Sequence, residues 1–144
     1  MTVKDTRIRL LRNEKGIKDP YRLRRLRCSD CRKIHMELPD LMHPYKQYAS
    51  SVIEAALDET RNDCPADDST IHRWKAEYRK LRQALEGALI SLWIQFHKKQ
   101  YPLLDKNSLL DEITGDGPGW LTRVTKVLVN AGLSPHTRFA CCPP

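Results

Sequence analysis

Hydrophobic and basic positions alternate in two short segments near the start of the chain. Residues 6–11 read TRIRLL, residues 21–27 read YRLRRLR, and Asn13 to Gly16 between them is a turn-forming run. Alternation with a period of two is typical of strands, so the two segments predict a β-hairpin. Residues 32–38, which follow Cys28-Ser-Asp-Cys31, predict a third strand that Pro39 ends.

From Tyr45 onward the apolar residues take the spacing of helices. A first helix is predicted from Tyr45 to about Asp58, and residues 60–68 form a polar linker. A second helix begins near Ser69, where an Asp or Ser side chain can cap the first turn. It continues through Gly87, a predicted bend or close-packing point, into the apolar residues 88–96. Its buried stripe recurs every three or four residues at Ile71, Trp74, Tyr78, Leu81 and Leu85.

Two shorter helices are predicted after that. They cover residues 103–113 and 120–131, with a Gly/Pro-rich turn at 115–119 between them and Gly132 as the C-terminal cap of the second. The fold class is therefore α+β: a small basic β-hairpin followed by a mainly α-helical bundle with a helix-turn-helix-like pair. We expect three regions: the hairpin with its cysteines at 1–44, the helix-turn-helix-like helices at 45–100, and the C-terminal helices and tail at 101–144.

The positive charge of the chain is concentrated in its first quarter. Residues 1–36 hold 12 Lys/Arg and four Asp/Glu, a net charge of +8, whereas the other 108 residues hold 13 basic and 14 acidic groups, a net charge of −1. Such asymmetry is typical of a surface that binds phosphate, because each phosphate neutralised releases condensed counterions.

The apolar segments are too short for a membrane span. The longest, residues 88–96, is well below the roughly 20 residues that a spanning helix needs. Asp5, Arg7 and Arg9 interrupt any signal-peptide core. We therefore expect a cytoplasmic protein that contacts no membrane, and in that compartment the five cysteines favour metal ligands or inert thiols over a disulfide framework.

Cys28 and Cys31 form a C-x-x-C pair directly after a basic strand. Two thiolates from a tight turn at a hairpin end make half of a zinc ribbon, so zinc is the predicted cofactor. A structural zinc site needs four ligands, and the other candidates, His35, His43 and Cys64, have no spacing that singles one out. Two free thiols in a degenerate knuckle are the alternative. A redox reading is weaker, because the flanking segments look like strands.

The helix that begins near Ser69 is a second candidate for chemistry. A recognition helix docks by an apolar stripe and presents small, polar and basic side chains near its N-terminus. Five residues match that description, and a solvated helix face explains them equally well. The linker before this helix is longer than a standard helix-turn-helix turn. The five residues that match the description of a recognition helix are Ser69, Thr70, His72, Arg73 and Lys75.

Enzymatic signatures are missing from the sequence. We find no paired acid/base site, no nucleophile with a base, no phosphate loop and no H-x-x-x-H spacing. Nothing supports a two-metal nuclease or transposase site. We expect no enzymatic activity.

The segment YRLRRLRCSDCRKIHMELPDLMHPYKQYASSVIEAAL, followed by STIHRW, resembles a family of uncharacterised bacterial proteins described as transposase-like or mobile-element proteins. The resemblance implies an N-terminal zinc ribbon and a helix-turn-helix-like region. That ribbon has a second CxxC upstream of the basic hairpin, whereas no Cys precedes Cys28 here. Either the true start lies upstream of Met1, or this member has lost or replaced half of its metal site. Cys28 and Cys31 carry over as two ligands.

Taken together, the sequence predicts a nucleic-acid-binding protein, with duplex DNA as its partner. The resemblance adds a regulatory or accessory role in a mobile genetic element, with other mobile-element proteins as possible partners. A non-enzymatic protein-interaction module that binds an acidic partner through the basic arm is the alternative. RNA binding is less favoured, because Tyr21 is the arm's single aromatic residue. The predicted phosphate contacts are Arg22, Arg24, Arg25, Arg27, Arg32 and Lys33.

Overall fold

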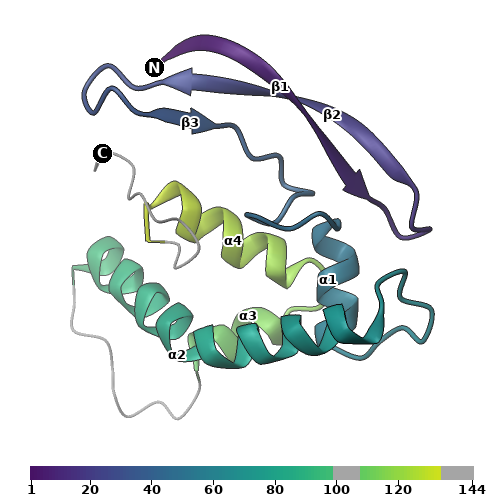
Figure 1. The fold of residues 1–144 in the computed structure, drawn as a ribbon. Coiled ribbons are helices and arrows are strands. Elements are labelled where there is room, and N and C mark those ends of the chain that lie inside the picture. The colour runs from purple at the N-terminus through teal and green to yellow at the C-terminus, as the bar shows by residue number, and fades with distance from the viewer. Residues whose placement is uncertain (99–107, 134–144) are drawn as a thin grey trace.

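The computed structural model describes residues 1–98 and 108–133. Within those residues, a three-stranded antiparallel sheet comes first and four helices follow (Figure 1). This arrangement confirms the predicted α+β class. The elements are β1 (Thr2–Arg12), β2 (Lys18–Arg27), β3 (Ile34–Met36), α1 (Ser50–Leu57), α2 (Asp68–His97), α3 (Leu109–Gly115) and α4 (Trp120–Asn130).

The sheet has the strand order β1-β2-β3, and the predicted hairpin forms its larger part. In the turn, the Asn13 side chain accepts hydrogen bonds from the backbone N–H groups of Lys15 and Ile17 at 2.9 and 3.1 Å. Gly16 has a φ of +77° there, a left-handed conformation that favours glycine. Both strands extend beyond the predicted segments, because main-chain pairing continues where the apolar alternation stops.

The two faces of the sheet differ in what covers them. Cross-strand partners share a face, and successive residues of one strand point to opposite faces. Leu11 and Leu23 are buried and pack with Met42, so they define the inner face. Ile8 and Leu10 lie on the opposite, outer face and are 61% and 50% exposed. The connecting segment that holds Met42 therefore covers part of one face, and the other face is open.

Residues 42–49 connect the sheet to the helices. The backbone N–H of Arg12 donates to the carbonyl of Gln47 at 2.7 Å, and its carbonyl accepts from Ala49 at 2.9 Å. The predicted start of the first helix at Tyr45 is wrong, since α1 begins at Ser50. Tyr45 has a left-handed φ of 60°, and the backbone after it pairs with the end of β1 instead of forming a helical turn.

The long helix α2 has the buried stripe that its sequence predicts. Trp74 and Leu85 are buried, and the stripe continues through Leu89 and Leu92. A Cβ at Gly87 would meet no atom within 4 Å beyond the helix's own backbone, so the close-packing explanation of this glycine is wrong. The ten-residue connection between α1 and α2, residues 58–67, is longer than a helix-turn-helix turn.

The last two helices pack on α1 and α2. Residues 103–107 of the third predicted helix lie outside the described residues, and α3 begins at Leu109. The fourth predicted helix, 120–131, agrees with α4 to within one residue, and Gly132 follows it with a left-handed φ of 69°. Leu110 of α3 and Trp120 of α4 are among the most buried side chains of the core.

Two carboxylates from other helices, one buried and one half-buried, cap the N-termini of α4 and α3. Glu54 of α1 accepts hydrogen bonds from the backbone N–H groups of Gly119 and Leu121 at 2.6 and 2.8 Å. Glu86 of α2 does the same for Leu109 and Leu110 at 2.9 and 3.0 Å. The first N–H groups of a helix have no partner within it, so these carboxylates fix where α4 and α3 start.

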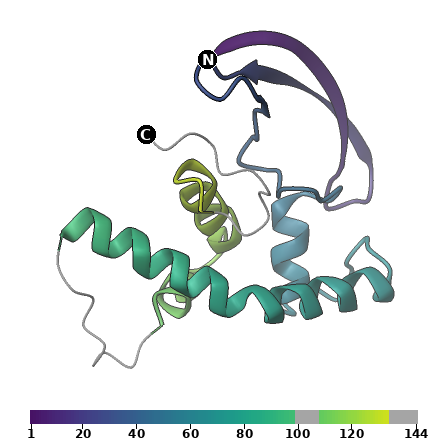
Figure 2. The ribbon, with the colours of Figure 1, turned by 60° about the vertical axis from the view of Figure 1, so that its left-hand side comes forward.

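The sheet arches over one side of the helical layer (Figures 1 and 2). The β1–β2 turn lies beside α1, and the opposite end of the sheet, where β2 leads into β3, lies away from α1. No helix among the described residues is long and apolar enough to cross a membrane.

Candidate metal centre and nucleic-acid interface

Three potential metal ligands meet at the end of the sheet farthest from α1. Cys28 directly follows β2, Cys31 lies in the turn, and His35 lies in β3. The turn is closed by a hydrogen bond from the Cys28 N–H to the Lys33 carbonyl at 3.0 Å, and Arg32 has a left-handed φ of 56°. The register pairs His35 with Leu26, two residues before Cys28, and so brings the imidazole to the thiols.

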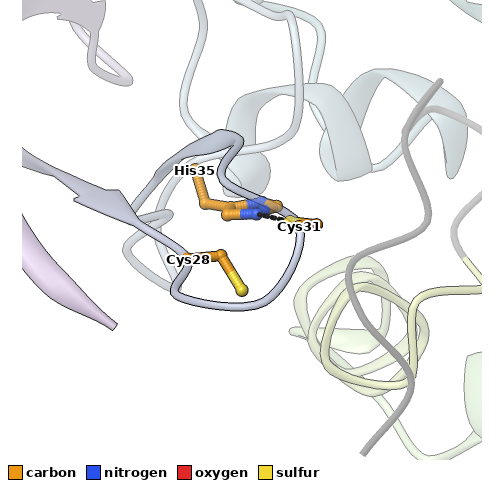
Figure 3. Close-up of side chains that lie close together, drawn as sticks. All are labelled: Cys28, Cys31 and His35. Carbon is orange, nitrogen blue, oxygen red and sulfur yellow. Dashed lines mark hydrogen bonds between the residues drawn. The ribbon is translucent and has the colours of Figure 1, made fainter.

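The geometry of this cluster suits a metal ion. The ligand atoms of Cys28, Cys31 and His35 all lie within 4.8 Å of one another, and the Cys31 Sγ is 3.5 Å from the His35 Nε2 (Figure 3). In a tetrahedral zinc site with typical bond lengths, neighbouring sulfur and nitrogen ligands lie about 3.3–3.8 Å apart. Cys28 is 4% exposed. The three side chains are therefore close enough to bind one metal ion.

The third ligand resolves an ambiguity of the sequence. His43 is buried in the segment between the sheet and α1, and its Nδ1 lies 3.1 Å from the Oγ1 of Thr125 in α4. Cys64 precedes α2 and packs against the main core. His35 alone of the three candidates joins Cys28 and Cys31, and among the described residues no further His, Cys, Asp or Glu belongs to the cluster.

The predicted phosphate-binding residues are divided between the two faces of the sheet. Arg22 and Arg24 lie on the outer face with Ile8, and Arg25 and Arg27 lie on the inner face with Leu23. Arg32 and Lys33 belong to the turn that holds the cysteines. The six residues thus extend from the middle of β2 to the turn at the metal-ligand end and do not form one flat surface.

Two of these arginines are partly neutralised. Arg24 donates from Nε and Nη2 to the Glu37 carboxylate at 2.8 and 2.5 Å, and Arg25 makes the same bidentate pair with Asp5. Hydrogen bonding to the arginine is the main cause that holds the pKa of each carboxyl group below its ordinary value. Both pairs cross between strands and so stabilise the sheet.

Other basic side chains of this region keep their charge available. Arg22, Arg27 and Arg32 are exposed and make no ion pair with any residue that the structure describes. Arg27 directly precedes Cys28 and Arg32 directly follows Cys31, whereas Arg22 lies in the middle of β2. Positive charge is therefore unbalanced at this end of the sheet.

At the start of α2, several predicted readout residues have structural partners. The hydroxyl groups of Ser69 and Thr70 donate to the Asp67 carboxylate at 2.6 and 3.1 Å. Lys75 donates to Glu59 at 2.6 Å. His72 and Arg73 are exposed, and Arg73 donates to the Thr70 hydroxyl at 3.3 Å.

Some relevant residues were missed by sequence reasoning. The carboxylates Asp5 and Glu37 determine which arginines are neutralised, and their pairing depends on the strand register. The pattern around Ile8 and Leu10 predicts strands and does not indicate that these two side chains stay exposed on one face. The alternation in residues 6–11 and 21–27 indicates which side chains of each strand share a face, but the register is needed to match the faces of the two strands.

A basic sheet that ends in a Cys₂His cluster, followed by a helical bundle, defines a small α+β protein with a candidate metal centre in its N-terminal half. The family model for a domain of unknown function (DUF6431) matches residues 1–74, and the chain belongs to this family. The matched residues hold the whole sheet, the three candidate ligands, α1 and the start of α2. No curated protein and no solved structure matches the chain.

Proposed function

We propose that this protein binds duplex DNA through its N-terminal sheet and that zinc, held by Cys28, Cys31 and His35, fixes the end of that sheet. The observation that carries the proposal is the unbalanced charge of Arg27 and Arg32, which directly adjoin Cys28 and Cys31 in the chain. Exposed guanidinium groups with no carboxylate partner are suited to phosphate oxygens, and their binding releases counterions.

The zinc ion has a structural role in this proposal. Bound zinc would tie the end of β2 to β3 through two thiolates and one imidazole, with the fourth coordination position filled from outside this set. That constraint holds the turn carrying Arg32 and Lys33, whose side chains then meet the phosphate backbone in a defined geometry. Arg24 and Arg25 contribute less to phosphate binding, because Glu37 and Asp5 already neutralise them.

Two further roles extend this proposal. A regulatory or accessory task in a mobile genetic element, together with partners from such an element, depends on the sequence resemblance alone. A protein-interaction module that binds an acidic chain is the alternative function, and the same exposed arginines favour it. The two are separated by salt dependence on duplex DNA.

The DNA proposal is tested by measuring affinity for duplex DNA between low and moderate salt concentrations. For the wild type we expect a steep fall, and each phosphate-contacting arginine replaced lowers the slope of log K against log salt by roughly one unit. The variant Arg27→Ala/Arg32→Ala should therefore lose about two units of slope. The matched control is Arg79→Ala/Lys80→Ala, which removes two exposed charges from α2. Unchanged binding in the first variant would refute the proposal.

The zinc proposal is tested by metal analysis of the purified protein. We expect one equivalent of zinc per chain, and its loss in Cys31→Ser and in His35→Ala. Cys64→Ser is the control, because this thiol lies against the core and away from the cluster. Zinc retention by the His35→Ala variant would show that the imidazole is not a ligand.

A further inference from the structure

The outer face of the sheet has an ordered arrangement of side chains that the charge argument does not explain. The register sets Ile8 opposite Arg22 and Leu10 opposite Pro20, so exposed apolar side chains of β1 lie beside one charged and one apolar residue of β2. Three apolar side chains on this face are exposed: Val3 by 57%, Ile8 by 61% and Leu10 by 50%. These apolar side chains therefore have a common direction and lie beside an exposed guanidinium group.

Ile8 and Leu10 are neighbours on this face, since they are two residues apart on one strand, and adjacent exposed apolar side chains of this kind are typical of binding surfaces. A second copy of the chain is a poor occupant, since packing two of these faces together would bring Arg22 and Lys18 of each copy against those of the other. The cores of protein interfaces are depleted of charge. Duplex DNA, in contrast, offers anionic phosphates on either side of base edges that carry both polar and apolar groups.

The dimensions of the face also suit a DNA groove. Neighbouring strands lie about 4.8 Å apart, and the major groove, about 12 Å wide, admits a two-stranded ribbon. Directly opposed side chains lie about 5 Å apart, so Ile8 and Arg22 would address the same or adjacent base pairs. The β1–β2 ribbon is the longest exposed pair in the described structure.

At the start of α2, the other candidate for base contacts, three of the five candidate side chains are already engaged, whereas His72 and Arg73 are exposed. Ser69 and Thr70 are engaged by the capping residue Asp67, and Lys75 is paired with Glu59. A base contact by these side chains would first have to break the helix cap or the ion pair. Arg22 makes no ion pair among the described residues and needs no such exchange.

We propose that the outer face of the β1–β2 ribbon enters the major groove and reads base sequence, with Arg22 directed at guanine and with Ile8 and Leu10 against thymine methyl groups. This inference rests on the proposed DNA binding and assigns the sequence readout to the sheet in place of α2. A guanidinium group pairs in bidentate fashion with guanine O6 and N7, and apolar side chains contact the C5-methyl group of thymine.

The first test selects preferred duplexes from a random pool and compares the wild type with Arg22→Lys. Lysine keeps the charge and loses the bidentate geometry. We expect about a tenfold or larger loss of preference for guanine at one position, with the salt slope unchanged. The matched control is Arg73→Lys at the start of α2, which should leave the selected sequence unchanged. A shift of preference in the control and none in Arg22→Lys would overturn the inference.

The second test replaces thymine by uracil in the selected site. Because the change is made in the DNA, the wild-type protein can be tested without any substitution. Each methyl group contacted should contribute about fourfold to wild-type affinity, from the transfer free energy of one buried carbon. The Ile8→Ala/Leu10→Ala variant should bind thymine and uracil sites equally. A wild type that is indifferent to uracil, or a variant that remains as sensitive as the wild type, would refute the contact.

The outcomes separate the inference from the proposal beneath it. If wild-type affinity for duplex DNA did not fall steeply with salt, the proposed DNA binding itself would be refuted. If affinity fell steeply but the protein showed no sequence preference, only the readout by the outer face would be refuted. A concentration-dependent dimer that Ile8→Ala/Leu10→Ala converts to a monomer would show that a second copy occupies the face. That result would overturn the inference.

Discussion

Replacing Glu54 by alanine is expected to destabilise the helical part more than any other change of a single charged residue described above. The carboxylate is 7% exposed, and it accepts hydrogen bonds from Gly119 and Leu121 at the start of α4. The N-cap residue of α4, Gly119, has no side chain that could replace it.

The magnitude follows from the two donors that lose their partner. A buried backbone N–H left unsatisfied costs about 1–3 kcal/mol, and the bond from Leu121 is buried whereas that from Gly119 is half-buried, so Glu54→Ala should lower the free energy of unfolding by about 2–4 kcal/mol. Water entering the vacated space would bring the value toward the lower end. Glu54→Gln keeps one acceptor oxygen and should lose about half as much, because its amide nitrogen faces the second N–H and cannot accept from it.

Urea denaturation followed by circular dichroism measures these differences, and a constant m-value confirms that stability alone has changed. Glu112→Ala is the matched control, since this carboxylate lies exposed on α3, and its effect should stay within about 0.5 kcal/mol. Hydrogen exchange of the Gly119 and Leu121 amides should accelerate in Glu54→Ala. A loss no larger than that of the control would refute the capping role.

Three further outcomes are expected. Leu110 is fully buried in the core, so Leu110→Ala should lower the free energy of unfolding, measured in urea, by about 2–5 kcal/mol. A loss below about 1 kcal/mol would mean that the core collapses around the smaller side chain. Gly16 has a φ of +77°, and an added Cβ would lie 3.3 Å from the Pro65 Cβ, so Gly16→Ala should lower the melting temperature, measured against Gly115→Ala. The pKa of Asp5 is lowered by its hydrogen bond from Arg25, so the pair stabilises the sheet above the ordinary Asp pKa and that contribution disappears as pH falls through the lower folded pKa. NMR titration should show this transition below about pH 4, and Asp5→Asn should abolish it.

Much of the local structure could be predicted from the sequence. Period-two alternation located the hairpin, and the spacing of Trp74 and Leu85 located the buried side of α2. The final helix was placed within one residue. In these segments local propensity and the burial pattern agree, so short-range information suffices.

The candidate site was predictable only in part. The C-x-x-C spacing indicated two ligands, because a tight turn is enough to bring Cys28 and Cys31 together. His35 could not be chosen over His43 or Cys64, because that choice depends on the pairing of β3 with β2. Likewise, the sequence grouped Arg24 and Arg25 with the free cations, whereas pairing across the sheet gives each a carboxylate.

The sequence by itself determined the α+β class, the concentration of positive charge in the first quarter and the two cysteines that begin the candidate metal centre. Each of these depends on composition or on residues a few positions apart. Only the tertiary structure decided which histidine joins the cysteines and which arginines remain unpaired. It also decided that Glu54 caps the start of α4, more than sixty residues away in the chain. These outcomes depend on strand register and helix packing, which no local pattern encodes.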